Sequence, residues 1–205
     1  MNILAVLPLA FVMVAGPQIL SSFFFATSDN WRGTSAAYLL GSALSISLIV
    51  TAAFLLTSGA SDAGTSDDTI YYIVLALLLF AMVHTFRTRK TAEPPSWMGK
   101  LQTATPKFAF RLGFALLGFF PSDLLTSISV GGYLNAKGSP LWYALGFLGL
   151  TLLLIALPAL LVLIMGRRAE EFLPKVRDWM NNNSWIVNEA VLVLFVGIVI
   201  SSIAG

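Results

Sequence analysis

Long apolar segments alternate with short polar ones along this chain. Six segments have the apolar character of membrane-crossing helices, at residues 3–26, 34–56, 69–84, 109–130, 140–165 and 185–204. A spanning helix needs about 20 mostly apolar residues, so the third segment is short unless it begins near Asp68. The pattern predicts an all-α membrane protein with six transmembrane helices and almost no soluble part.

Two of these segments are interrupted near their middle by a proline. Pro17 lies in the run Gly-Pro-Gln at 16–18, and Pro121 lies in the run Phe-Pro-Ser-Asp at 120–123. Proline removes a backbone donor and clashes with the preceding turn, so a helix kinks or breaks there. In lipid such a break is tolerated only where the freed backbone groups face protein or a water-lined cavity. We therefore predict that the first and fourth helices are broken inside the membrane.

Asp123 makes the second break the more informative of the two. A carboxylate at membrane depth is costly and by default suggests a function, and paired helix breaks in two halves of a chain mark a transporter's substrate site. In one interpretation Asp123 binds a cationic group or carries a proton. In the structural alternative, Ser122 or Asp123 caps the half-helix that restarts after the break. The candidate substrate-binding residues are Gly16, Pro17, Gln18, Ser21, Ser22, Pro121, Ser122, Asp123 and Thr126.

The chain also repeats itself. Shifted by 105 positions, residues 18–56 align without a gap on residues 123–161, with identities at Leu20/Leu125, Ser22/Ser127, Asn30/Asn135, Gly33/Gly138, Tyr38/Tyr143, Leu40/Leu145, Gly41/Gly146, Leu48/Leu153, Leu55/Leu160 and Leu56/Leu161. The leucine matches prove little, whereas those of Asn, Gly, Tyr and Ser are informative. Each unit holds three helices, an odd number, so the second unit enters the membrane from the opposite side. This predicts two inverted three-helix repeats, at 1–90 and 108–205, joined by a cytoplasmic linker at 91–107.

Composition and charge support this class and suggest an orientation. Hydrophobic residues make up 57% of the 205 and charged residues 11%, whereas soluble domains have about 25% charged residues. All of the 12 lysines and arginines except Lys137 lie in or beside the loops after the first, third and fifth segments. The positive-inside rule places those loops in the cytoplasm. We expect a multi-pass protein of the cytoplasmic membrane with both termini outside.

The polar residues offer little for catalysis. Cysteine is absent, which excludes disulfides, thiolate metal sites and a cysteine nucleophile. His84 is the only histidine and is expected near the cytoplasmic surface. We see no paired carboxylates, no metal-ligand cluster and no nucleotide-binding loop. The sequence therefore predicts a protein that is not an enzyme and has no cofactor and no metal.

One cytoplasmic segment has the pattern of an interfacial helix. Between the fifth and sixth apolar segments, apolar residues recur at helical spacing with charges between them, at Phe172, Leu173, Val176, Trp179 and Met180. Such a pattern predicts an amphipathic helix that lies in the membrane interface.

The chain resembles a known transporter superfamily. The run Gly-Pro-Gln at 16–18, followed by Trp-Arg-Gly at 31–33 and by Gly41, resembles the first-repeat pattern of the lysine-exporter (LysE) superfamily. Pro158, the segment 167–179 and Asn182 resemble one branch, the sulfolipid-addressing or peptidoglycolipid-addressing proteins. Where the superfamily commonly has Asn-Pro-Lys-Asn, this chain has Phe-Pro-Ser-Asp at 120–123. The resemblance covers nearly the whole chain and implies a six-helix exporter that moves glycolipid precursors toward the cell envelope.

The preferred function is thus a secondary transporter or exporter. Its substrate is a glycolipid, an amino acid or a small cation, since each fits a polar site at the bilayer midplane. Two alternatives stay open: an ion channel, and a membrane accessory protein that assists a lipid exporter. The expected partners are the lipid bilayer and a transported small molecule or lipid, with a homodimer as one possible assembly. A net charge of +2 gives no reason to expect nucleic acid.

Overall fold

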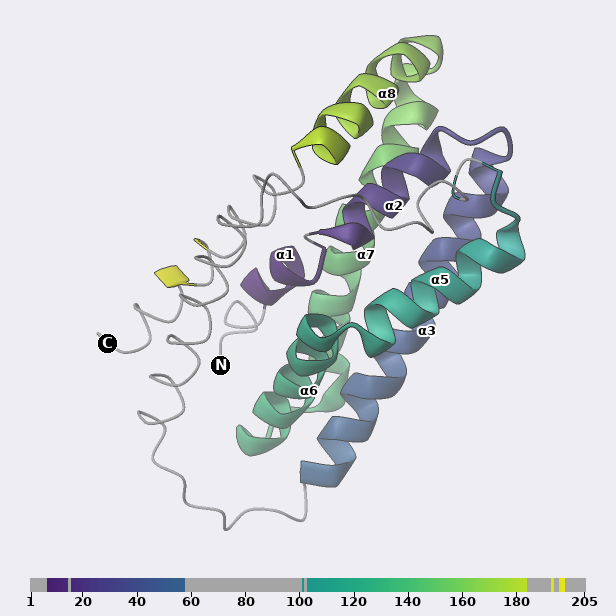
Figure 1. Cartoon of the computed structure of the whole chain (residues 1–205). Helices are drawn as coiled ribbons and strands as arrows, with labels where there is room; N and C mark the ends of the chain where they lie inside the picture. The colour runs from purple at the N-terminus through teal and green to yellow at the C-terminus, as the bar shows by residue number, and fades with distance from the viewer. Residues whose placement is uncertain are drawn as a thin grey trace.

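The computed structural model describes residues 7–14, 16–57, 101, 103–183, 193 and 196–197. Within them the secondary structure is helical (Figure 1), with elements α1 (Pro8–Val14), α2 (Pro17–Ala26), α3 (Trp31–Thr57), α5 (Pro106–Phe119), α6 (Pro121–Ala136), the 3-10 helix η3 (Leu141–Tyr143), α7 (Ala144–Met165) and α8 (Arg167–Asn182). The prediction of an all-α chain is confirmed for this part. Three predicted segments lie wholly or mostly outside the described residues: the span 69–84, the span 185–204 and the linker 91–107. The topology with six spans therefore stays a prediction.

Within the described residues, two helices are long and apolar enough to cross a membrane, which indicates a membrane protein. They are α3, with 27 residues, and Leu141–Met165, with 25 residues. Large apolar side chains on α3 point away from the protein, with Leu40 65% and Leu55 62% exposed, while hydroxyl-bearing Thr34 and Ser42 are fully buried. Leucines outside and small polar residues inside reverse the arrangement of a soluble helix, and they fit a helix surrounded by lipid.

The fourth predicted helix is broken where the sequence placed the break. Helices α5 and α6 form a pair bent by 66°, and together they pass the length and composition test for one span. Phe120 between them is extended, with φ −68° and ψ 128°, and Pro121 is the first residue of α6. A residue before proline is pushed out of the helical region, and proline itself is favoured at the first helical position. Both effects put the bend at Phe120.

The break in the first helix uses a glycine. Gly16 separates α1 from α2 and has φ 101° and ψ −138°, a conformation that residues with a Cβ rarely adopt. Pro17 then begins α2, as Pro121 begins α6. The predicted breaks in both helices are therefore present, and each second half-helix starts with a proline.

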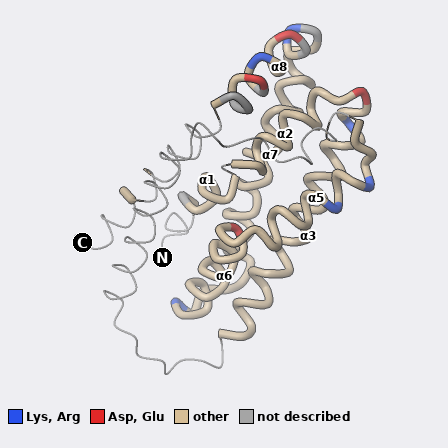
Figure 2. Tube along the Cα trace, in the orientation of Figure 1, with Lys and Arg blue, Asp and Glu red and all other residues tan. Residues whose placement is uncertain are grey.

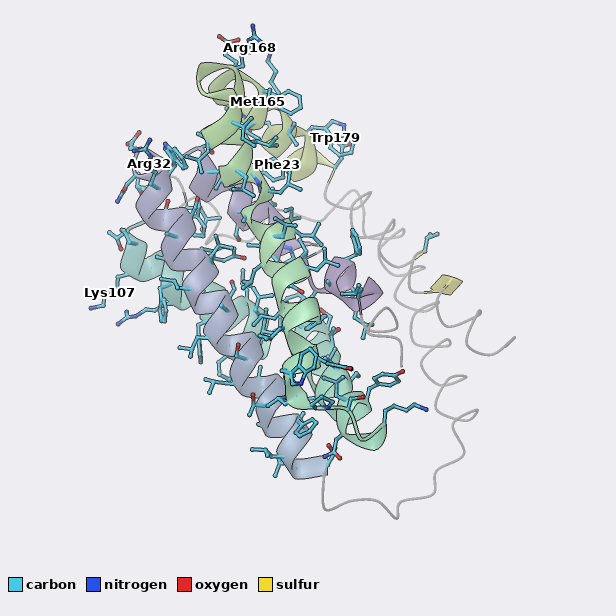
Figure 3. All side chains as sticks on the ribbon, turned by 180° about the vertical axis from the view of Figure 1, so that it is seen from behind. Phe23, Arg32, Lys107, Met165, Arg168 and Trp179 are labelled. Carbon is cyan, nitrogen blue, oxygen red and sulfur yellow. The ribbon has the colours of Figure 1, made fainter. Side chains whose placement is uncertain are left out.

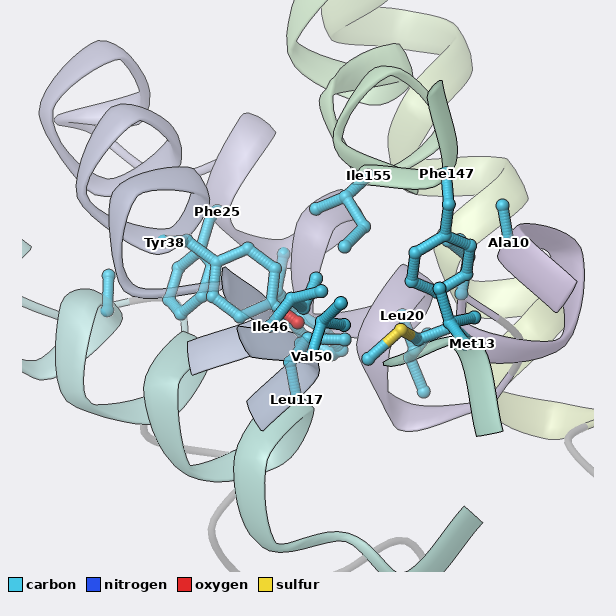
Figure 4. Packing of buried hydrophobic residues seen from close by; sticks show 14 of the residues in the cluster. Ala10, Met13, Leu20, Phe25, Tyr38, Ile46, Val50, Leu117, Phe147 and Ile155 are labelled. Carbon is cyan, nitrogen blue, oxygen red and sulfur yellow. The ribbon is translucent and has the colours of Figure 1, made fainter. Parts of the chain in front are cut away.

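Helices from the two halves of the sequence pack against each other. The long helix α3 packs on α5 and α6, while α7 packs on α1 and α2 (Figure 1). One buried cluster joins all six of these helices, including Met13, Leu20, Phe25, Tyr38, Leu117, Val130, Phe147 and Ile155 (Figure 4). The core is thus shared between the two halves.

Small residues allow α3 and α5 to approach each other closely. A Cβ added at Gly41 would lie 2.1 Å from the carbonyl oxygen of Phe110, and one added at Gly113 would lie 2.4 Å from the carbonyl oxygen of Tyr38. Neither backbone atom can move aside without shifting a helix. Gly41 of α3 and Gly113 of α5 therefore serve close packing, as is usual for small residues between membrane helices.

We expect Gly41→Ala to destabilise the protein. The added methyl group would overlap the backbone of α5, and overpacking of this kind costs about 1–3 kcal/mol. Gly149→Ala is a matched control, because a Cβ at Gly149, also inside a long helix, would have no atom of the described residues within 4 Å. Thermal unfolding in detergent should show a lower melting temperature for Gly41→Ala alone. Equal melting of both variants would contradict the close approach of α3 and α5.

Candidate functional site at the junction of the two broken helices

The two helix breaks lie against each other inside the bundle. Gln18, directly after the first break, donates a hydrogen bond from Nε2 to Oδ2 of Asp123, just after the second break. Both side chains are 0% exposed. Figure 2 shows one acidic position within the helical bundle, where α5 meets α6, while the other acidic positions of the described chain lie near its charged end. The structure thus unites two candidate residues that are 105 positions apart in the sequence.

Both residues sit at the start of a half-helix. Gln18 is the second residue of α2, and Asp123 is the third residue of α6, in its first turn. Helix N-termini carry unpaired N–H groups and the positive end of the helix dipole, which stabilise negative charge. In transporters with interrupted helices, half-helix N-termini of this kind face anionic groups of the substrate. The junction therefore has the electrostatics of a polar site inside a membrane.

Two hydroxyl groups complete the junction. Ser122 donates from Oγ to Oδ1 of Asp123 at 3.2 Å, and Tyr38 of α3 donates from its hydroxyl to the backbone oxygen of Gln18 at 3.0 Å. The Tyr38 ring is 1% exposed and packs on Phe25, with 5.1 Å between ring centroids (Figure 4). Tyr38 was not among the candidate residues predicted from sequence. The available signal was its recurrence as Tyr143 in the shifted alignment.

The other predicted hydroxyl residues turn back onto their own helices. Ser21 donates to the backbone oxygen of Pro17 at 2.6 Å, and Ser22 to that of Gln18 at 3.1 Å. Thr126 donates to the backbone oxygen of Ser122 at 2.7 Å. These three hydroxyls satisfy carbonyl groups of the first helical turn. Their first role is therefore to support the two half-helices, and they make no hydrogen bond to Asp123 or to the Gln18 side chain.

The remaining candidates shape the backbone. Gly16 and Pro17 set the start of α2, and Pro121 sets the start of α6. Gly16 and Pro17 are half-buried, whereas Pro121 and Ser122 are exposed on the described part of the protein. At the second break, Pro121 and Ser122 are thus exposed, while the next residue, Asp123, is buried.

The capping interpretation of Ser122 and Asp123 is wrong. The N-cap of α6 is Phe120, and no side chain caps this helix. The Asp123 backbone N–H donates to the oxygen of Phe120 at 3.0 Å, while its carboxylate accepts hydrogen bonds from Gln18 and Ser122. A capping carboxylate would instead accept from N–H groups of its own helix. Asp123 is directed across the junction to the other broken helix.

One buried acceptor at the junction is unused. Gln18 Oε1 is buried and has no hydrogen-bond partner among the described residues. Leaving a buried polar group unpaired costs about 1–3 kcal/mol, and such groups in membrane proteins mark ion or substrate paths. Gln18 Oε1 and the Asp123 carboxylate together form a pair of hydrogen-bond acceptors. That pair suits a ligand that donates hydrogen bonds, such as a hydroxyl, an ammonium group or a hydronium ion.

Two apolar grooves lie along α7. A groove of about 380 Å³ between α3 and α7 is lined by Ile46, Ser47, Val50, Thr51, Leu141, Trp142, Ala144, Leu145, Phe147 and Leu148. A second, of about 280 Å³, is lined by Phe11, Val14, Ile19, Phe23, Leu154, Leu157 and Pro158. Ile19 directly follows Gln18, so this second groove adjoins the half-helix that carries the junction.

Comparison with known families identifies the chain. Residues 6–204 match the family SfLAP, described as "Sap, sulfolipid-1-addressing protein". No curated protein and no solved structure gives a significant match. Since the match covers nearly all of the 205 residues, this chain belongs to the sulfolipid-1-addressing protein family.

Proposed function

We propose that this protein is a secondary transporter that exports a lipid with a polar headgroup across the cytoplasmic membrane. The observation that carries the proposal is the buried hydrogen bond between Gln18 and Asp123, which joins two broken helices. Interrupted helices that meet at membrane depth, with half-helix N-termini at the meeting point, are the common construction of substrate sites in secondary transporters. A buried carboxylate in the same place supplies a group for ion coupling or substrate binding.

The family and the grooves favour a lipid as the substrate. The family description names a sulfolipid, and the groove between α1, α2 and α7 is lined by apolar side chains. In our proposal an acyl chain lies in this groove, next to Ile19, and the headgroup reaches the acceptors of Gln18 and Asp123. Membership of the LysE superfamily is part of the same proposal.

We further propose that the two halves form an inverted repeat. Gln18 and Asp123 are equivalent in the alignment shifted by 105 positions, and residues related by a two-fold axis contact each other only near that axis. The packing of α3 on α5 and α6, with α7 on α1 and α2, is the exchange of partners that such an axis produces. Rocking about an axis through the junction would expose the site to each side of the membrane in turn.

Charge distribution supports an orientation with α8 in the cytoplasm. Figure 2 shows basic positions near α8 and near the starts of α3 and α5, and a further one at the far end of α6. Arg32, Lys107 and Arg168 belong to the first group (Figure 3). The positive-inside rule then places this end inside the cell and Lys137 outside.

We expect single cysteines to report this orientation in intact cells. The chain has no native cysteine, and both Lys107 and Lys137 are exposed. A membrane-impermeant maleimide should label Lys137→Cys and should label Lys107→Cys only after the cells are lysed. The opposite pattern would invert the proposed orientation.

Transport by the protein alone tests the function. Purified protein in liposomes should accelerate the movement of a fluorescent sulfated glycolipid between leaflets, compared with protein-free liposomes. An imposed ion gradient should drive net accumulation on one side, since coupling is expected at Asp123. Liposomes that show ionic conductance without lipid movement would indicate a channel.

A second candidate is an accessory protein for lipid export. The family description speaks of addressing a sulfolipid, which favours a role in delivery to a separate exporter. Such a protein would bind the glycolipid but move none between leaflets on its own. If lipid moves between leaflets only after membrane extract of the source cell is added, this candidate is supported and the first is overturned.

A further inference from the structure

Helix α8 has a packed face that fixes it to the bundle. Ala169 and Leu173 are 0% exposed and form a cluster with Ala26 of α2 and Val162 of α7, against which Phe23 also packs. The helix contacts both α2 and α7. The predicted amphipathic helix is therefore present, and its packed face is covered by protein. The exposed residues of α8 lie on its other faces.

A second stripe on α8 combines basic and aromatic side chains. Arg168, Phe172, Lys175 and Trp179 follow one another at spacings of four, three and four residues. With about 3.6 residues per turn they fall on one narrow face beside the packed one. All four are exposed, with Phe172 at 51% and Trp179 at 53%, and Arg168 projects from the end of the molecule (Figure 3). We call these four residues the α8 stripe.

Two acidic residues of α8 flank the stripe on one side. Glu171 and Asp178, both exposed, are seven residues apart and so share a face of their own. That face lies on the side of the stripe away from Ala169 and Leu173. The helix therefore has a packed face and, next to it, an exposed stripe in which cations alternate with aromatic rings.

We propose that the α8 stripe is a binding site for the anionic headgroups of membrane phospholipids. Tryptophan favours the boundary between headgroups and acyl chains, and lysine and arginine extend their charged ends toward headgroups from an apolar base. Two exposed aromatic rings that alternate with two cations along the helix match such a boundary in both polarity and charge. The stripe thereby orients α8 on the cytoplasmic leaflet.

The geometry favours a lipid surface over a free anion. Arg168 and Lys175 are seven residues apart, which is about 10 Å along a helix with a rise of 1.5 Å per residue. Two cations at this spacing can each contact a different headgroup of the same leaflet. Phe172 and Trp179 contribute nothing to binding a free anion in water, but they are stabilised when inserted beside acyl chains.

The test uses Trp179 as the reporter in the full-length protein. The other tryptophans, Trp31, Trp97, Trp142 and Trp185, are replaced by phenylalanine. The protein is then placed in phosphatidylcholine nanodiscs that contain brominated phosphatidylglycerol, or brominated phosphatidylcholine at the same mole fraction. We expect stronger quenching by the anionic lipid. Each cation should contribute about fivefold to the apparent affinity, which corresponds to ~1 kcal/mol per basic residue.

Arg168→Gln combined with Lys175→Gln should abolish the preference for the anionic lipid while leaving quenching by brominated phosphatidylcholine. The matched control is Lys107→Gln with Arg111→Gln, two exposed cations of α5, which should keep the preference. Arg168→Lys with Lys175→Arg should also keep it, which separates loss of charge from misfolding.

Three results would overturn the proposal. The first is equal quenching by both brominated lipids in the wild-type background. The second is an unchanged preference in the Arg168→Gln, Lys175→Gln variant. The third is equal loss of preference in the α5 control, because the effect would then come from net charge and not from the α8 stripe.

Discussion

Asp123→Asn should abolish transport and leave the protein folded. Asparagine has nearly the same shape, and its amide oxygen can still accept the hydrogen bond from Gln18 that Asp123 accepts in the structure. What it loses is the charge and the ability to take up a proton. Proteoliposome transport should fall to the level of empty liposomes, while the melting temperature in detergent stays close to wild type.

Asp123→Ala is the informative comparison. It removes the acceptor altogether and leaves the buried amide of Gln18 unpaired, at a cost of about 1–3 kcal/mol. A lowered melting temperature is therefore expected for alanine but not for asparagine. Full transport by a well-folded Asp123→Asn variant, over a range of pH, would end the ion-coupling proposal. The carboxylate would then serve only to hold the two broken helices together.

The helix breaks could be predicted because they depend on local chemistry. Pro17 and Pro121 lack a backbone donor wherever they stand, and Gly16 adopts a backbone conformation that other residues avoid. The bend of 66° between α5 and α6 follows from such local effects. The same holds for the long helices, whose apolar runs are visible in the sequence without any tertiary information.

The direction of the Asp123 side chain could not be predicted locally. A carboxylate one turn into a helix is compatible with a cap and with a contact to another helix. The local sequence around Asp123 does not reveal that Phe120 becomes the N-cap or that Gln18 lies within hydrogen-bonding distance. The choice depends on packing between helices that are 105 residues apart in the sequence. The contact of Tyr38 with the backbone of Gln18, 20 residues away, also depends on packing between helices.

The shifted alignment of the sequence provides information on this contact that the local pattern does not. The alignment shifted by 105 positions begins by pairing Gln18 with Asp123, and these are the residues that meet. Because Gln18 and Asp123 are different residue types, a comparison of identical positions alone would not have found this pair. The agreement of Ser21 with Thr126 goes further, because both hydroxyls bond to equivalent backbone oxygens, those of Pro17 and Ser122.

Exchanging the two junction residues should test the proposed two-fold relation directly. Gln18→Asp alone places two carboxylates together in a buried site, and an uncompensated buried charge costs about 3–5 kcal/mol. Asp123→Gln alone leaves two amides, which can still bond to each other. The double variant restores one amide and one carboxylate with their places reversed. If the environments are equivalent, it should recover most of the stability lost in Gln18→Asp.

The double variant should not recover all of the lost stability, because one hydrogen bond is missing in it. Ser122 supports Asp123 with a hydrogen bond of 3.2 Å, but Pro17 stands at the equivalent place in the first half and has no hydroxyl to donate. One missing hydrogen bond of this kind is worth about 1 kcal/mol. Thermal unfolding of the four proteins should therefore give a coupling energy of about 2–3 kcal/mol, at the upper end for residues in contact. Additive losses in the double variant would show that the two positions are not equivalent, and the inverted repeat would lose its central support.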